Sequence, residues 1–173
     1  MNNARRSKKA IKFLEGANPN YLNGKLNYAS YQGGCQVFTD SFVAFKLKNY
    51  LNDLPIYEGN DYPTIDNFIA DGLKDSTKFF SYDDVLKVLE KRKNDKIRKN
   101  SKKHLNREYL YIMRDEEKET THFLDPLKVK TVIEILGCKP EELIVKSGGE
   151  FVQVQFFTPS GDMALIMPCR IGR

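Results

Sequence analysis

Cysteine and histidine side chains are the residues most often used for metal or nucleophilic chemistry, and their spacing in this chain favours neither. The three cysteines, Cys35, Cys138 and Cys169, are far apart and odd in number, which fits neither a disulfide framework nor a zinc motif. The two histidines, His104 and His122, have no second histidine or cysteine three or four residues away. We therefore expect reduced, mostly buried thiols, and neither a metal site nor a cofactor.

The acidic residues stand where solvated or capping roles are expected, on predicted loops, helix caps and turns. They are Asp61, Asp66, Asp71, Asp83, Asp84, Asp115, Glu116 and Glu117. None of them has the spacing of a catalytic acid and base or of a two-metal site. The glycine pairs 33–34 and 148–149 indicate hairpin turns, because no helix with Lys or Ser follows them as in a phosphate loop. The sequence therefore predicts no catalytic residue and no enzymatic activity.

The most concentrated charge lies between Lys91 and Arg107, where nine basic residues stand against one acidic residue. The whole chain has a formal net charge of +5, so the rest of it is slightly acidic. Such a run can follow a phosphate backbone and bind it in a salt-dependent way. The residues assigned to DNA contact are Lys91, Arg92, Lys93, Lys96, Arg98, Lys99, Lys102 and Lys103.

A solvated, flexible connector is the competing interpretation of this basic run. Asn94, Asn100 and Ser101 favour it, and no aromatic residue is interleaved to stack on bases. A second basic cluster lies on the first predicted helix and could join the same face. Its members are Arg5, Arg6, Lys8, Lys9 and Lys12.

Length and composition are typical of a folded protein. The 173 residues include 40% hydrophobic and 29% charged side chains, which excludes disordered and fibrous classes and allows a core without disulfides. The longest apolar runs, near Phe42 and Leu165, are far shorter than the roughly 18 residues of a membrane span. No apolar stretch follows the basic N-terminus as in a secretory signal, so we expect a cytoplasmic protein without a membrane partner.

In the N-terminal part, the spacing predicts one helix followed by a meander of antiparallel strands. Ala10, Phe13 and Leu14 recur at helical spacing within 4–16. Short stretches rich in β-forming residues follow, separated by turn residues. The predicted strands are 26–31, 36–39 and 42–47, and 48–78 is expected to be an irregular linker that packs on the fold.

The C-terminal part repeats this order after an additional helix and hairpin. Ser81 and Asp84 indicate a capping box at the start of one helix. Asp125 and Pro126 begin a second helix, over 126–136, which Gly137 ends. The predicted strands are 109–113 and 120–123, which form a hairpin, and then 143–146, 151–158 and 163–167.

A helix followed by three strands thus occurs near the start and again at the end, which is a weak internal repeat. The pattern predicts an α+β fold in which helices cover one side of antiparallel β-meanders. We divide the chain into halves 1–78 and 79–173, with 91–107 as a basic insertion in the second half. Both halves are expected to form one compact unit.

Three segments resemble the bacterial DNA sliding clamp, the β subunit of DNA polymerase III. They are 21–26 (YLNGKL), 37–44 (VFTDSFVA) and 165–171 (LIMPCRI), and they occur in the order found in that family. The segment 62–69 is similar to the one that joins the middle and last clamp domains, and 123–136 to the second helix of the last domain. The resemblance implies a DNA-clamp-like fold.

The departures from the clamp pattern are large. A clamp subunit is about twice as long, so a whole domain and parts of two others have no counterpart here. This chain has Ser41, Phe42 and Val43 where the family has Gly, His and Arg, and Cys169 where it has Met. A single shortened unit cannot close a ring around DNA, so whether it forms homo-oligomers through strand edges stays open.

In clamps, the matching segments line a hydrophobic pocket that takes short linear peptides of polymerases and repair proteins. The resemblance therefore implies a peptide-binding wall made of Leu22, Thr39, Ser41, Phe42, Val43, Ala44, Leu165, Met167, Pro168, Cys169, Arg170 and Ile171. Such a surface could bury leucine and aromatic anchors while Arg170 meets a carbonyl or carboxylate. The alternative is that Leu165, Met167 and Ile171 are core residues of an edge strand.

Two functions from different classes follow from these patterns. The first is a non-enzymatic, clamp-like adaptor that binds a linear-motif peptide of a replication or repair protein, with sequence-independent contact to duplex DNA left open. The second is a small basic DNA-binding or regulatory protein of a phage or mobile element, without a peptide pocket.

Overall fold

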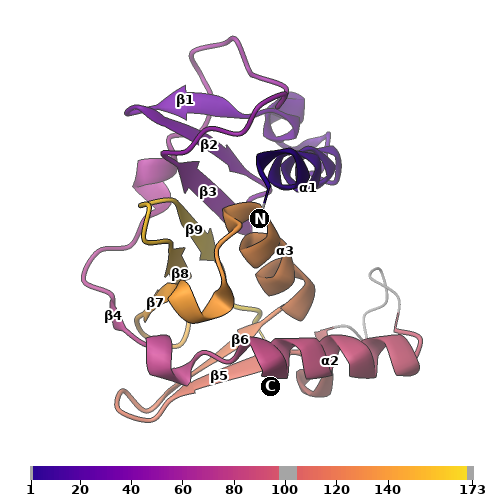
Figure 1. The fold of residues 1–173 in the computed structure, drawn as a ribbon, viewed down its shortest axis with the longest axis vertical. Helices are drawn as coiled ribbons and strands as arrows, with labels where there is room; N and C mark the ends of the chain where they lie inside the picture. The colour runs from indigo at the N-terminus through magenta and orange to yellow at the C-terminus, as the bar shows by residue number, and fades with distance from the viewer. Residues whose placement is uncertain (1, 98–104, 171–173) are drawn as a thin grey trace.

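The computed structural model describes residues 2–97 and 105–170 and has an α+β architecture (Figure 1). A seven-stranded sheet has the order β1-β2-β3-β9-β8-β7-β4, and each neighbouring pair is antiparallel. The strands of this sheet are β1 (Ser30–Gln32), β2 (Cys35–Thr39), β3 (Val43–Leu47), β4 (Lys74–Asp75), β7 (Ile144–Ser147), β8 (Val154–Phe157) and β9 (Met163–Ile166). A separate hairpin pairs β5 (Tyr111–Asp115) with β6 (Thr120–Leu124).

The α-helices lie where the sequence predicts them. They are α1 (Asn3–Glu15), α2 (Tyr82–Asn94) and α3 (Pro126–Leu136). Ser81 caps α2 by accepting the N–H of Asp84 at 3.3 Å. Asp125 caps α3, Pro126 occupies its first position, and Gly137 ends it in the left-handed region at φ +68°. Short 3-10 helices are η1 (Tyr21–Asn27), η2 (Ile65–Phe68), η3 (Thr77–Phe79), η5 (Arg107–Tyr109) and η6 (Pro140–Glu142).

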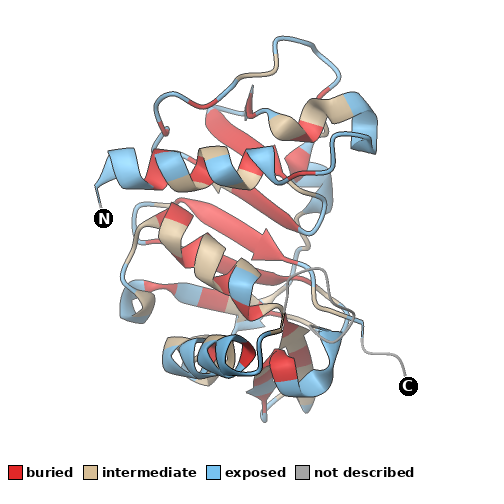
Figure 2. Cartoon of the chain, turned by 90° about the vertical axis from the view of Figure 1, so that its right-hand side faces the viewer, coloured by how far each residue is buried: buried red, intermediate tan, exposed pale blue. Residues whose placement is uncertain are grey.

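The main hydrophobic core lies between the sheet and the helices α1 and α3, which lie side by side on the same face (Figure 2). Phe38, Phe45, Ala164 and Phe156 follow one another across β2, β3, β9 and β8 in register, and all four are fully buried. The rings of Phe38 and Phe45 stack with their centroids 4.7 Å apart. The expected placement of helices on one side of antiparallel strands therefore holds.

The opposite face of the sheet is covered by the irregular segment between β3 and β4. Tyr62 and Ile65 pack there against Val37, Ala44 and Leu165 in a second cluster of buried side chains. Two glutamines of this face also hold the segment, because Gln155 donates to the carbonyl of Ala70 at 3.0 Å and Gln153 donates to that of Phe68. The stretch predicted as a packing linker thus forms the second layer over the sheet.

One predicted strand, 26–31, is largely replaced by η1 and a shortened β1. The chain passes through the left-handed region at Leu22, Asn23 and Gly24, with φ of 49°, 56° and 78°. The side-chain amide of Asn27 then donates to the carbonyl of Leu14 at 2.8 Å, which satisfies a backbone acceptor at the end of α1. Pairing with β2 begins only at Ser30, because the residues before it form η1 and pack against the end of α1.

The strand predicted over 151–158 is also shorter and begins at Val154. Its first residues form a turn in which Val152 donates its N–H to the carbonyl of Gly149 at 2.9 Å. At this end of the molecule, α2 packs beside the hairpin β5–β6 (Figure 1). No helix among the residues described is long and apolar enough to cross a membrane.

The order of elements along the chain has a counterpart in the sheet. The helix α1 is followed by β1, β2 and β3, and α3 is followed by β7, β8 and β9. In the sheet these two sets of strands meet at the pair β3–β9, and β1 and β7 lie farthest from it within each set. The sheet is therefore continuous between the two parts of the chain.

Candidate functional site

The end of β9 lies beside the start of β3, although these segments are far apart in the sequence. Val43 pairs with Ile166 and Ala44 with Leu165 in antiparallel register. Beyond the strand, Met167 donates its N–H to the carbonyl of Phe42 at 2.8 Å. The β2–β3 turn and the chain that follows β9 therefore form one surface.

Three buried side chains of neighbouring strands form the floor of a depression on this surface. Thr39, Ala44 and Leu165 follow one another across β2, β3 and β9, and all are buried. Because side chains alternate along a strand, these three face away from α1 and α3. Ala44 carries only a methyl group, which leaves space above the floor.

Large hydrophobic side chains stand around this floor and remain exposed. Leu22 is 45% exposed, Phe42 57%, Phe68 56% and Met167 39%. Together they enclose a cavity of about 140 Å³, which we call the apolar slot. Its lining residues are Tyr21, Leu22, Leu26, Thr39, Ser41, Phe42, Val43, Ala44, Pro63, Phe68, Leu165 and Met167.

The turn between β2 and β3 holds one wall of the apolar slot in place. The carboxylate of Asp40 accepts the N–H groups of Phe42 at 2.9 Å and Val43 at 2.7 Å. The hydroxyl of Thr39 accepts the N–H of Ser41 at 3.0 Å and donates to the carbonyl of Val43 at 2.8 Å. Ser41 adopts a left-handed conformation at φ 79°. The exposed ring of Phe42 therefore projects from a well-bonded turn.

The opposite wall comes from the segment that covers this face of the sheet. Tyr62 is buried and donates its hydroxyl to the carbonyl of Tyr28 at 3.0 Å, which ties this segment to the chain before β1. Burial raises the pKa of Tyr62 well above its ordinary value, so its hydroxyl stays protonated as a donor. The next residue, Pro63, lines the slot. Phe68, the last residue of η2, also lines it, and Gln153 donates a hydrogen bond to the carbonyl of Phe68.

A second depression of about 610 Å³, the adjoining hollow, shares Ser41, Phe42 and Met167 with the apolar slot. Its other lining residues are Leu105, Asp125, Lys128, Pro168, Cys169 and Arg170. The segment after β9 is fixed in this hollow because Cys169 donates its N–H to the carbonyl of Phe123 at 2.7 Å. Burial raises the pKa of the Cys169 thiol, so it is protonated near neutral pH and packs as soft apolar surface.

The residues that the resemblance assigned to a peptide-binding wall are mostly brought together. Those in the apolar slot are Leu22, Thr39, Ser41, Phe42, Val43, Ala44, Leu165 and Met167. Those in the adjoining hollow alone are Pro168, Cys169 and Arg170. Ile171 lies outside the described residues. Leu165 is buried, as the alternative interpretation expected, but β9 is a central strand and not an edge strand, and Met167 is exposed. Leu165 also contributes to the floor of the slot.

Four slot residues were not foreseen from the sequence: Tyr21, Leu26, Pro63 and Phe68. Tyr21 and Leu26 belong to the segment 21–26 that resembles a clamp, and the other two lie within 62–69. The segments that resemble a clamp therefore contained these four residues, although none of them was assigned from the sequence to the peptide-binding wall.

The structure corrects part of the predicted DNA-contacting run. Arg92 is buried, donates from Nε to the carbonyl of Tyr109 at 2.7 Å and forms an ion pair with Asp125 at 2.8 Å. It therefore holds α2 against the chain before β5 and cannot reach a phosphate. Lys91 forms an ion pair with Glu108 at 2.9 Å. Lys93 and Lys96 are exposed, whereas Arg98, Lys99, Lys102 and Lys103 lie outside the described residues.

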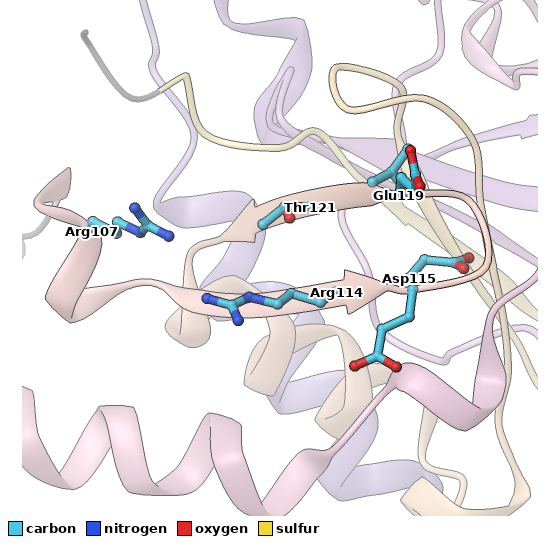
Figure 3. A pocket seen from close by; sticks show the side chains of 7 residues that line it. Arg107, Arg114, Asp115, Glu119 and Thr121 are labelled. Carbon is cyan, nitrogen blue, oxygen red and sulfur yellow. The ribbon is translucent and has the colours of Figure 1, made fainter.

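A polar hollow of about 450 Å³ lies on the hairpin β5–β6 (Figure 3). Arg114 comes from β5 directly before Asp115, and its side chain extends toward the open end of the hairpin, where Arg107 lies, whereas Asp115 and Glu119 lie near the turn. All of its lining side chains are charged or carry a hydroxyl, so it offers no apolar anchor point. Within the residues that the structure describes, no group of three His, Cys, Asp or Glu side chains could hold a metal ion.

Comparisons of the chain with protein-family models, curated proteins and solved structures found no match. The geometry of the site is therefore the basis for inferring a function.

Proposed function

We propose that this chain is a non-enzymatic, clamp-like adaptor whose apolar slot binds a short linear peptide of a DNA replication or repair protein. One observation carries the proposal. Distant segments of the chain converge on a buried apolar floor, and the side chains around that floor are large, hydrophobic and exposed. Concave apolar surfaces of this kind are typical of sites that take leucine or aromatic anchors from a peptide.

The clamp-like part of the proposal is supported by the succession of elements. A helix and three strands occur twice, and the two sets of strands meet at β3–β9. In this interpretation the halves 1–78 and 79–173 are the two repeats, and the apolar slot lies at their junction. The slot is lined by residues of the segments 21–26, 37–44 and 62–69 and by Leu165 and Met167, all of them within stretches that resemble clamp segments.

Sequence-independent contact with duplex DNA is a secondary part of the proposal, and it rests on exposed cations. Lys93 and Lys96 are exposed at the end of α2, and Arg5, Lys8 and Lys12 are exposed along α1. The competing function, a small basic DNA-binding protein without a peptide pocket, would depend on these side chains alone. Such binding weakens steeply as salt concentration rises, whereas anchoring in an apolar slot does not.

The test is fluorescence anisotropy with a labelled clamp-binding peptide from a bacterial replicative polymerase. We expect Leu22→Glu and Met167→Glu each to weaken binding by about tenfold or more, because each places a charge in the slot wall. Leu86→Glu is the matched control, since Leu86 is similarly exposed at 41% but lies on α2. Its affinity should equal that of the unmodified protein.

The same titration is repeated at low and high salt and with a labelled DNA duplex. Peptide affinity that survives high salt supports the adaptor. If the peptide does not bind, and the duplex binds in a strongly salt-dependent manner, the DNA-binding alternative replaces it.

A further inference from the structure

The polar hollow on the hairpin β5–β6 contains two arginines that the fold leaves without an ionic partner. Arg107 and Arg114 both line the hollow, and both are exposed. Within the part of the chain that the structure describes, neither forms an ion pair. Arg6 and Arg92, in contrast, are buried in ion pairs that join distant elements. The two arginines of the hollow are therefore available to a ligand.

Strand register places these groups on one face of the hairpin. Arg114 pairs with Thr121 across β5 and β6, so their side chains lie on the same face. Phe123 lies two residues beyond Thr121 and shares that face. The guanidinium carbon of Arg107 lies 5.4 Å from the centroid of the Phe123 ring. Two guanidinium groups and one hydroxyl therefore line the same side of the hollow.

The arginine side chains are directed toward a common region. Arg114 extends along the hairpin toward its open end, where Arg107 lies (Figure 3). The ring of Phe123 supports the guanidinium of Arg107, and a stacked guanidinium keeps the N–H donors at its edge. Each guanidinium presents a planar fork of donors that matches the oxygens of a phosphate or a carboxylate. Thr121, which also lines the hollow, adds a hydroxyl donor.

The acidic residues of the hollow restrict the size of an anion that fits beside the arginines. Asp115 is buried, and its charge is compensated by Lys118 at 2.6 Å. Glu116 and Glu119 are exposed and follow the last residue of β5, in the turn. A long polyanion that passed from the arginines along the hollow would meet these two carboxylates. A compact anion held at the open end would not.

We propose that Arg107, Arg114 and Thr121 form a binding site for a compact phosphate dianion, either inorganic phosphate or the phosphate group of a small monoester. Two guanidinium charges match the nearly two negative charges that a phosphate monoester carries at pH 7. A carboxylate has one charge and two oxygens, so it would leave part of the site unused. The site shares no lining residue with the apolar slot, so this inference is independent of the proposed function.

The experiment is a titration of the full ¹⁵N-labelled chain, followed by amide chemical shifts at pH 7.5 and constant ionic strength. The ligands are inorganic phosphate, phenyl phosphate and diethyl phosphate. The first two should shift the amides of Arg114 and Thr121 in a saturable way. Diethyl phosphate, which carries a single charge, should bind at least about fivefold more weakly. Added sodium chloride should weaken binding of the dianions.

Variants of the protein then identify the contacts. Arg107→Gln and Arg114→Gln should each weaken binding of phenyl phosphate at least about fivefold, because each removes a charge-assisted hydrogen bond. Thr121→Val should weaken it about two- to threefold through the loss of one neutral hydrogen bond. The matched control is Arg5→Gln, since Arg5 is also an exposed arginine but lies on α1. This control should keep the full affinity.

Several outcomes would overturn the phosphate site. Equal weakening by Arg5→Gln would show a general effect of net charge, and equal affinity for phenyl and diethyl phosphate would show that no dianion is selected. The absence of saturable shifts at Arg114 and Thr121 would also reject the site. So would a DNA duplex that binds through Arg107 and Arg114 when neither phosphate does. Each result leaves the adaptor standing, because Leu22→Glu should weaken peptide binding without changing phosphate binding.

Discussion

Arg6 donates from its guanidinium to the carboxylate of Asp162 at 2.9 Å, although the two residues lie near opposite ends of the chain. Both side chains are almost completely buried. The Nε of Arg6 also donates to the carbonyl of Ile135 at 2.7 Å, and Asp162 accepts the N–H of Asn49 at 2.9 Å. The pair therefore ties α1 to the end of α3 and to the β8–β9 turn.

Removing Arg6 should strongly destabilise the protein. Arg6→Met leaves the Asp162 carboxylate buried without its cation, so the free energy of unfolding should fall by about 3 kcal/mol. Urea unfolding at neutral pH measures this loss. Arg5→Met is the control, because Arg5 is the exposed neighbour and should change stability by less than about 0.5 kcal/mol. Equal effects of the two variants would contradict the structural role given to the pair.

The Asp40 carboxylate should matter more for peptide affinity than for stability. Asp40→Ala removes the acceptor of the Phe42 and Val43 N–H groups, which should cost about 1 kcal/mol of stability in this partly exposed turn. Because the turn then loses its fixed shape, the slot wall at Phe42 becomes less ordered and peptide affinity should fall several-fold. Parallel measurements of urea unfolding and peptide anisotropy test this. Unchanged affinity would show that the wall does not need a preformed turn.

The sequence predicted the elements whose signals are local. The Asp125 cap, Pro126 and Gly137 fixed the limits of α3, and the buried stripe followed from spacing. The convergence of the β2–β3 turn with the chain after β9 is a non-local property, and only the ordered resemblance to clamp segments suggested it. Periodicity alone cannot pair two distant strands.

Features that depend on a distant partner could not be predicted in this way. Arg92 was assigned to DNA contact and Arg6 to a basic cluster that could join the same face, yet both are buried, and each forms an ion pair with a carboxylate far along the chain. The slot residue Phe68 lies within 62–69, which resembles a clamp segment, but its place beside the slot depends on a distant residue, because Gln153 donates a hydrogen bond to its carbonyl. The 3-10 helix η1 was not predicted, because it needs left-handed backbone conformations and leucine at position 22 rarely adopts one.

Peptide binding should protect Cys169 from alkylation. Its thiol is half-buried in the adjoining hollow, and burial raises its pKa, so iodoacetamide should react slowly at pH 7 and faster as pH rises. A peptide that occupies slot and hollow should slow this reaction further, as mass spectrometry of the alkylated cysteines would show. Cys138 is the internal control, because it is also half-buried with a raised pKa but lies at the far end of α3. Equal protection of both thiols would indicate a global effect of the peptide and not occupancy of the hollow.

His122 is fully buried on β6, and neither of its ring nitrogens has a hydrogen-bond partner among the described residues. Burial lowers its pKa below the ordinary 6.5, and the nearby Asp115 carboxylate opposes this shift only in part. Lys118 adds to the lowering, while the carbonyl of Gly148 and the carboxylate of Glu150 act in the opposite direction. The folded protein therefore holds His122 neutral where the unfolded chain would already bind a proton.

This difference makes stability depend on pH in a definite direction. As pH falls through 6.5, the unfolded chain takes up a proton at His122 that the folded protein resists, so the free energy of unfolding decreases. His122→Leu removes this proton uptake and the unpaired ring nitrogens with little change in volume. At pH 7.5 its stability should match that of the unmodified protein to within about 1 kcal/mol. Between pH 7 and pH 5 the variant should lose less stability, and the gap between the two urea-unfolding curves isolates His122 from the carboxylates that titrate in both. A gap that stays constant over this range would mean that His122 has the same pKa in the folded and unfolded states, and that water reaches its ring.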